Sequence, residues 1–156
     1  MISSSINIAG PSGTGTPTVQ NQSAILPHSI NYVTNYSIVN FNNIFGMTLD
    51  EMKNMADHIV NSSSNFPQSS PTNPFKSKII IIDTTTPITL QPFYGSGIII
   101  SRANITIPNT RPINFNGIIY MMPNTTLSIN CPGTINGIII SEHGNNGQII
   151  LNNQHG

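Results

Sequence analysis

The sequence predicts a mainly β protein: a short parallel β-helix or solenoid with coils of about twenty residues, one helix and an extended N-terminal arm. Glycines spaced by twenty residues each open an isoleucine-rich run, as in Gly137-Ile138-Ile139-Ile140. A proline stands five residues before each of these glycines. A fixed period near twenty is typical of stacked coils. The residues that define the repeat are Gly97, Gly117, Gly137, Pro92, Pro112 and Pro132.

Residues 1–27 are predicted to form an extended arm. They are rich in Ser, Thr, Gly and Pro, which is typical of a segment without regular structure of its own. Such a segment is ordered only when something holds it, and in an assembly a neighbouring subunit can do so. We therefore expect contacts between this arm and a second copy of the chain.

Residues 28–76 are predicted to contain one or two strands, a helix and a loop. Apolar residues partly alternate over residues 29–45, which favours strands. Thr48 and Glu51 form a capping box that predicts a helix over residues 48–61. Three prolines then predict an irregular loop over residues 62–76. The apolar stripe of the helix consists of Leu49, Met52, Met55, Ala56, Ile59 and Val60.

Residues 77–156 are predicted to form the solenoid repeats, beginning with a strand over residues 79–82. Each repeat has room for three strands of four to five residues, with Gly and Pro at the corners. The isoleucine runs are uninterrupted, so both faces of that strand should meet apolar partners. One face fills the interior, and the N-terminal region or another subunit covers the other. The alternative is an antiparallel β-sandwich of the jelly-roll type.

The composition excludes some classes of partner and favours association with identical subunits. Only 6% of the 156 residues are charged and the net charge is zero, so no basic face is available for nucleic acid. A chain without net charge repels its own copies weakly. No run of hydrophobic residues is longer than five, which predicts no membrane insertion. No signal peptide is apparent, so we expect an exposed location reached without one, as on a virion, spore or surface appendage.

Candidate residues for chemistry are few. Asp83, Glu142 and His143 follow isoleucine-rich runs, and acids on neighbouring coils can serve glycan cleavage. They do not recur at the repeat period, which favours solvated turn residues and no enzyme. No cluster of metal ligands or phosphate-binding loop is present, so we predict no metal and no cofactor. Cys131 is the sole cysteine, either a buried thiol or an intermolecular disulfide between identical subunits.

Two segments carry a resemblance to a known kind of protein. Residues 117–130, Gly-Ile-Ile-Tyr-Met-Met-Pro-Asn-Thr-Thr-Leu-Ser-Ile-Asn, and residues 133–141, Gly-Thr-Ile-Asn-Gly-Ile-Ile-Ile-Ser, resemble the β-solenoid segments of bacterial surface proteins. These are adhesins of the choice-of-anchor A type and related pilus-associated domains. The two segments together make up 23 of the 156 residues. It implies a β-helical surface module and transfers no active site.

Together these observations predict a non-enzymatic structural subunit that self-assembles into an exposed filament, appendage, spore layer or virus particle. Its N-terminal arm and its β edges would make the contacts. The first alternative is a surface adhesin or glycan-binding module that recognises a glycan or a host surface. The second is a glycan-cleaving β-helix enzyme. The aromatic residues available for stacking on sugars are Tyr32, Tyr36, Phe93, Tyr94 and Tyr120.

Overall fold

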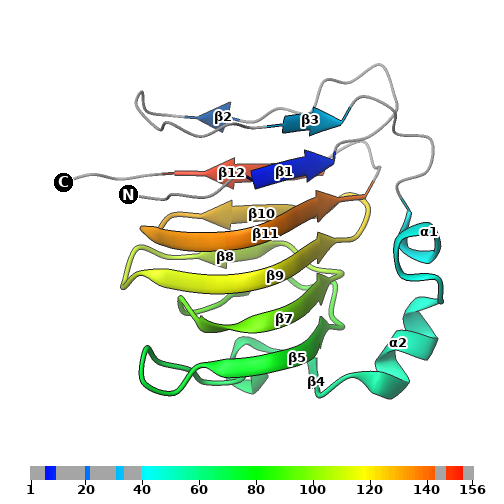
Figure 1. The fold of residues 1–156 in the computed structure, drawn as a ribbon, viewed down its shortest axis with the longest axis horizontal. Helices are drawn as coiled ribbons and strands as arrows, with labels where there is room; N and C mark the ends of the chain where they lie inside the picture. The colour runs from blue at the N-terminus through cyan, green and yellow to red at the C-terminus, as the bar shows by residue number, and fades with distance from the viewer. Residues whose placement is uncertain (1–5, 10–19, 22–30, 34–39, 143–146, 153–156) are drawn as a thin grey trace.

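The computed structural model describes residues 6–9, 20–21, 31–33, 40–142 and 147–152, and it is a parallel β-solenoid (Figure 1). A long strand alternates with a short one, so that each coil contributes one strand to each of two facing sheets. The long strands are β5 (Phe75–Ile82), β7 (Tyr94–Ser101), β9 (Ile113–Met121) and β11 (Gly133–Ser141). The short strands are β6 (Ile88–Thr89), β8 (Ile105–Ile107), β10 (Thr126–Ile129) and β12 (Gln148–Leu151).

Strands from the first part of the chain extend both sheets. The larger sheet, here sheet A, has the order β3-β1-β11-β9-β7-β5-β4, and the smaller, sheet B, has the order β2-β12-β10-β8-β6. Every pairing between these strands is parallel, which confirms the predicted solenoid and excludes the antiparallel sandwich. The added strands are β1 (Ile6–Ala9), β2 (Gln20–Asn21), β3 (Asn31–Val33) and β4 (His58–Val60).

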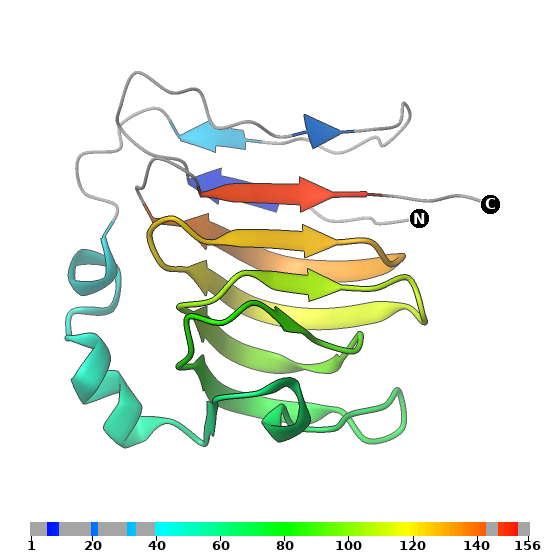
Figure 2. The same ribbon diagram turned by 180° about the vertical axis from the view of Figure 1, so that it is seen from behind.

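The predicted N-terminal arm contributes β1 and β2. In the register of sheet A, Ile6 pairs with Gly137 and Ala9 with Ile140. In sheet B, β2 pairs with β12. The start of the chain therefore forms a further coil on the last repeat of the same chain, and Figure 2 shows these strands at one end of the stack. The remainder of the arm lies outside the described residues.

The predicted number of strands per coil was wrong: there are two, not three. The long strand runs through the repeat glycine instead of turning there. Gly117 lies within β9, opposite Gly97 of β7, and has a φ of 147°. A Cβ atom at Gly117 would overlap the carbonyl oxygen of Gly97, and Gly137 stands in the same relation to Gly117. Close contact between coils in mid-strand, rather than a corner, therefore explains the twenty-residue glycine period.

The prolines of the repeat do lie at corners. Pro112 and Pro132 immediately precede β9 and β11, and Pro92 stands two positions before β7. A proline has no N–H group to leave unpaired and has a restricted φ, so it suits the position where the chain enters a strand.

The space between the two sheets is filled by apolar side chains in layers. Ile99, Ile119 and Ile139 are equivalent positions of successive coils and are at most 1% exposed. Near the other end of the long strands, the rings of Phe93 and Phe115 lie 5.6 Å apart at 81°. Isoleucine and phenylalanine ladders of this kind allow each coil to pack on the next with the same side-chain shape.

Two short helices cover the outer side of sheet A, where the isoleucine runs present their second apolar face. They are α1 (Phe41–Phe45) and α2 (Leu49–Met55), and Figure 1 shows them beside the C-terminal ends of the long strands. Phe41 and Met52 pack there against Ile81, Ile100, Tyr120 and Ile140. The expected cover is therefore supplied by the same chain.

The helix predicted over residues 48–61 was wrong at its C-terminal end. The capping box of Thr48 and Glu51 is present, but the helix ends at Met55. The carboxylate of Asp57 accepts a hydrogen bond from the Ile79 backbone N–H, and the Asp57 N–H donates to the Ile79 carbonyl oxygen. These bonds start the pairing of β4 with β5, so Ile59 and Val60 belong to a strand.

Two neighbouring boundaries also differ from the prediction. The segment expected to hold only strands contains β3 but also α1, because the Asn40 side chain caps a helical turn by accepting from the Asn43 N–H. The predicted loop over residues 62–76 contains a 3-10 helix, η1 (Ser63–Asn65), and ends at Phe75, where β5 begins.

Candidate functional site

The outer face of sheet A is divided along its strands into a covered apolar half and an open polar half. On β9, Ile118 and Tyr120 lie under the helices, whereas Asn114 and Asn116 precede the glycine and are exposed. Asparagine is also exposed at position 136 of β11, the position that pairs with Asn116. Its side-chain Nδ2 donates to Asn116 Oδ1 at 2.9 Å. The open half is therefore an amide-bearing surface on a rigid sheet.

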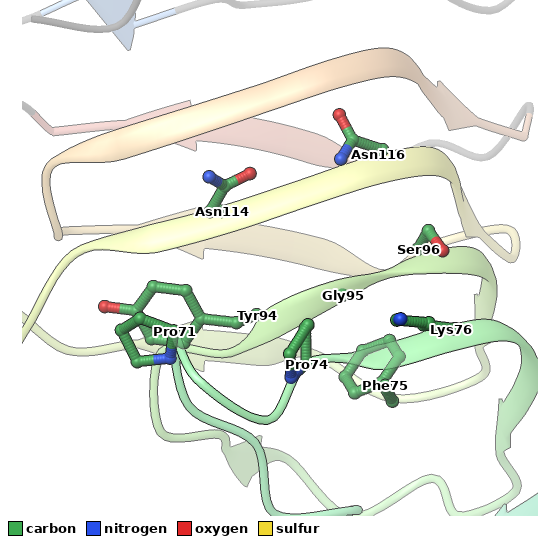
Figure 3. A pocket seen from close by; sticks show the side chains of 9 residues that line it. All are labelled: Pro71, Pro74, Phe75, Lys76, Tyr94, Gly95, Ser96, Asn114 and Asn116. Carbon is green, nitrogen blue, oxygen red and sulfur yellow. The ribbon is translucent and has the colours of Figure 1, made fainter.

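A hollow of about 420 Å³ lies on this open half, over the first residues of β5, β7 and β9 and beside the loop before β5 (Figure 3). The sheet contributes its floor, and two prolines of the loop stand in front of it. The backbone passes close at Gly95, where a Cβ atom would meet the ring of Phe75. The hollow is lined by Pro71, Pro74, Phe75, Lys76, Tyr94, Gly95, Ser96, Asn114 and Asn116.

Arg111 and Ser69 fix the wall of the hollow at Tyr94. The Arg111 guanidinium donates to the carbonyl oxygens of Pro92 at 2.9 Å and Ser69 at 3.2 Å, and lies 5.7 Å from the centre of the Tyr94 ring. The Tyr94 N–H donates to Ser69 Oγ at 2.9 Å. These contacts join the loop to β7, so the hollow keeps its shape without a ligand.

Lys76 and Asn114 carry free polar groups in the hollow. Within the described part of the chain, neither the Lys76 ammonium nor the Asn114 amide has a hydrogen bond or an ion pair. The other cations are engaged: Lys78 with Asp57 at 2.8 Å, and Arg102 with Asp83 at 2.7 Å. Lys53 also binds Asp83, at 2.8 Å. No acidic residue lines the hollow, so its charge is positive.

The two ends of the coil stack form a second candidate site. Sheet A ends at β3 on one side and at β4 on the other, and among the described strands each of them has a partner on one side only. Large apolar side chains are exposed beside β4: Ile59 of β4 is 45% exposed and Met55 of α2 is 51% exposed. A parallel edge with apolar neighbours is able to pair with another strand.

The acids considered for glycan cleavage are not brought together. The backbone N–H groups of Asp83, Arg102, Met122 and Glu142 occupy equivalent positions of successive coils, each bonded to the coil before it. Asp83 and Glu142 are thus three coils apart, or roughly 14 Å at the usual strand spacing. Glycoside hydrolysis needs carboxyl groups at most about 10 Å apart. His143 lies outside the described residues.

Both acids instead have structural partners. The hydrogen bond from Lys53, and a further one from Arg102, hold the pKa of Asp83 below its usual value. Glu142 accepts a hydrogen bond from the Tyr120 hydroxyl at 2.7 Å. Burial, together with this bond to Glu142, raises the pKa of Tyr120. These contacts tie neighbouring coils and the helices together.

Cys131 is 1% exposed and packs in the interior between the sheets. Burial raises the pKa of its thiol to about 11, so the reactive thiolate is scarce near neutral pH. Because it is buried, the thiol is not accessible to a second folded subunit. Of the two alternatives, Cys131 is therefore a buried thiol and not an intermolecular disulfide.

The aromatic residues considered for sugar stacking include both buried and partly exposed side chains. Phe93 and Tyr120 are buried, whereas Tyr94 is partly exposed in the hollow. The backbone of Tyr32 lies in β3, and Tyr36 lies outside the described residues.

Sequence reasoning missed Lys76, Asn114 and Asn116. The alternation Ile113-Asn114-Phe115-Asn116 was the available signal for two amides on one exposed face.

Comparison with protein-family models, with curated proteins and with solved structures gives no significant match. Of the helices in the described segments, none has the length and apolar character to cross a membrane. Within the same segments, no three His, Cys, Asp or Glu residues are grouped as metal ligands would be.

Proposed function

We propose that this chain is a non-enzymatic structural subunit that assembles end to end with copies of itself into an exposed filament, appendage, spore layer or virus particle. The observation that carries the proposal is the end of the stack at β4, where a backbone edge and the side chain of Ile59 are both uncovered among the described residues. Unpaired strand edges of this kind recruit strands from other chains.

The parallel order of sheet A supports a head-to-tail contact. When β4 of one copy pairs beyond β3 of the next, the strand direction and the coil stacking both continue. The two surfaces in this contact are different, so the contact is heterologous. A heterologous contact between subunits stacked along one axis does not close, and it produces a filament.

The N-terminal strands complete one of the two surfaces. Because β1 covers the edge of β11 and β3 in turn covers β1, β3 carries the outermost edge of sheet A at that end. The net charge of zero adds little repulsion between copies. The arm thus takes part in assembly by forming the end coil that receives the next subunit.

Light scattering of the purified full-length chain tests this proposal. We expect a polymer whose formation is abolished by deletion of residues 1–27 and by Ile59→Lys, because a lysine at this outward position of an edge strand opposes pairing. The control is Thr106→Lys, which adds the same charge at an exposed position of sheet B. Far-UV circular dichroism verifies that each variant keeps its strands. Polymers that form equally well in the deletion variant and in Ile59→Lys would contradict the proposal.

A further inference from the structure

The hollow on sheet A has a composition suited to one class of ligand. We propose that it binds an acidic oligosaccharide, with the Lys76 ammonium pairing with a uronate carboxylate and the Asn114 and Asn116 amides bonding to sugar hydroxyls. This inference is independent of assembly, because the hollow lies on the side of the stack and involves neither β3 nor β4.

The positive charge of the hollow favours a ligand that carries an anionic group. Lys76 is exposed and unpaired among the described residues, and no carboxylate lines the hollow to compete for it. A single ammonium is enough to select a carboxylate on a sugar, but nucleic acid binding requires several neutralised phosphates. The ligand is therefore a weakly charged chain rather than a polyphosphate.

The amides supply recognition of neutral hydroxyls. Asn114 and Asn116 alternate on β9, so their side chains leave the same face of the strand roughly 7 Å apart. Figure 3 shows both amides on the β9 side of the hollow, with Tyr94 and Ser96 on the adjacent strand β7. Asn114 offers both a donor and an acceptor, whereas Asn116 offers mainly its Nδ2 donor, because its Oδ1 already accepts from Asn136. Both kinds of group suit sugar hydroxyls. Two such groups at this spacing can bond to different positions along a sugar chain.

The walls of the hollow suit the apolar side of a sugar ring. Tyr94 gives an aromatic surface with a polar end, and Pro71 and Pro74 add rigid apolar surface. The volume of about 420 Å³ is within the range of pockets that hold small ligands. Since Arg111 and Ser69 already fix the wall, little ordering is needed on binding.

Isothermal titration calorimetry with uronate tetrasaccharides tests the proposal. The set comprises galacturonate, mannuronate, guluronate and hyaluronan fragments, each paired with its carboxyl-reduced counterpart. We expect saturable binding of at least one acidic member, and binding about tenfold weaker for the same chain after carboxyl reduction, because a charge-assisted hydrogen bond is lost. Absence of binding across the set, or equal binding of the acidic and reduced forms, would overturn the proposal.

Variants of exposed residues locate the site. Lys76→Met should weaken binding about tenfold, whereas Lys76→Arg, which keeps the charge, should stay within about threefold of the unchanged protein. Asn114→Ala should weaken it by about fivefold to tenfold through the loss of one hydrogen bond. Thr106→Ala, on the exposed side of sheet B, should have no effect. Binding that is the same in Lys76→Met and Asn114→Ala as in the unchanged protein would place the ligand elsewhere and contradict the assignment.

Discussion

Replacement of the central repeat glycine tests the explanation of the twenty-residue period. Gly117 lies in the middle of β9 with a φ of 147°, directly beside Gly97 of the previous coil. In Gly117→Ala, the added methyl group would overlap the carbonyl oxygen of Gly97. That oxygen belongs to the backbone of a paired strand and cannot rotate away, so the two coils must separate locally.

The expected cost has two parts. An alanine held at this φ costs about 1–3 kcal/mol in backbone strain. Separation of β7 from β9 weakens two or three of their hydrogen bonds, each with a net value of about 1 kcal/mol. The total destabilisation is therefore about 3–6 kcal/mol. Gly46→Ala is the matched control: Gly46 also has a positive φ, of 68°, but a Cβ atom there meets nothing within 4 Å. Its cost should be about 1–2 kcal/mol.

Urea denaturation followed by circular dichroism measures both values by linear extrapolation of the free energy of unfolding. The Gly117→Ala variant should unfold at a clearly lower urea concentration than Gly46→Ala, or should fail to accumulate as a folded protein. A Gly117→Ala variant that is no less stable than Gly46→Ala would refute the explanation of the period by close contact between coils.

The remaining predictions concern the cover over sheet A, the titrating groups and the thiol. Phe41→Ala should cost about 3–4 kcal/mol in urea denaturation, because Phe41 is 4% exposed and packs edge-to-face on Tyr120. The pKa of Tyr120 is raised, so the free energy of unfolding should fall as pH rises above the usual tyrosine value of about 10, and this slope should be smaller in Tyr120→Phe. The pKa of Asp83 is lowered, so the stability it contributes should be present above about 3.8 and be lost as pH falls below that value; Asp83→Asn should reduce this acid-side loss in the same titration. Cys131 should react with a thiol reagent at neutral pH only after unfolding, and rapid labelling of the folded protein would contradict its burial.

The repeat could be recognised in the sequence because successive coils have the same residue types at equivalent positions. Gly97, Gly117 and Gly137 predicted coils of about twenty residues, and the uninterrupted isoleucine runs predicted apolar partners on both faces. The position of the glycines within the strand was not predicted. A glycine before an apolar run indicates a turn or a close contact equally well, and only the paired coil distinguishes the two.

The helix boundary and the hollow depended on long-range contacts. Ile59 fits the spacing of a helix, but it lies in the strand β4 because it pairs with Ile81 of the neighbouring strand β5. Lys76 and Asn114 come together through the pairings of β5 with β7 and of β7 with β9, beside a loop that Arg111 holds in place. None of these long-range contacts can be recognised from the sequence around either residue. The candidate site was therefore less predictable than the fold.

Negative-stain electron microscopy of the purified chain shows whether copies of the protein join end to end. Pairing of β4 with β3 of the next copy predicts filaments in which the solenoid axis follows the filament axis, and their loss when Ile59 is replaced by lysine. Uniform single particles of the size of one chain, at concentrations at which the folded protein is abundant, would contradict it.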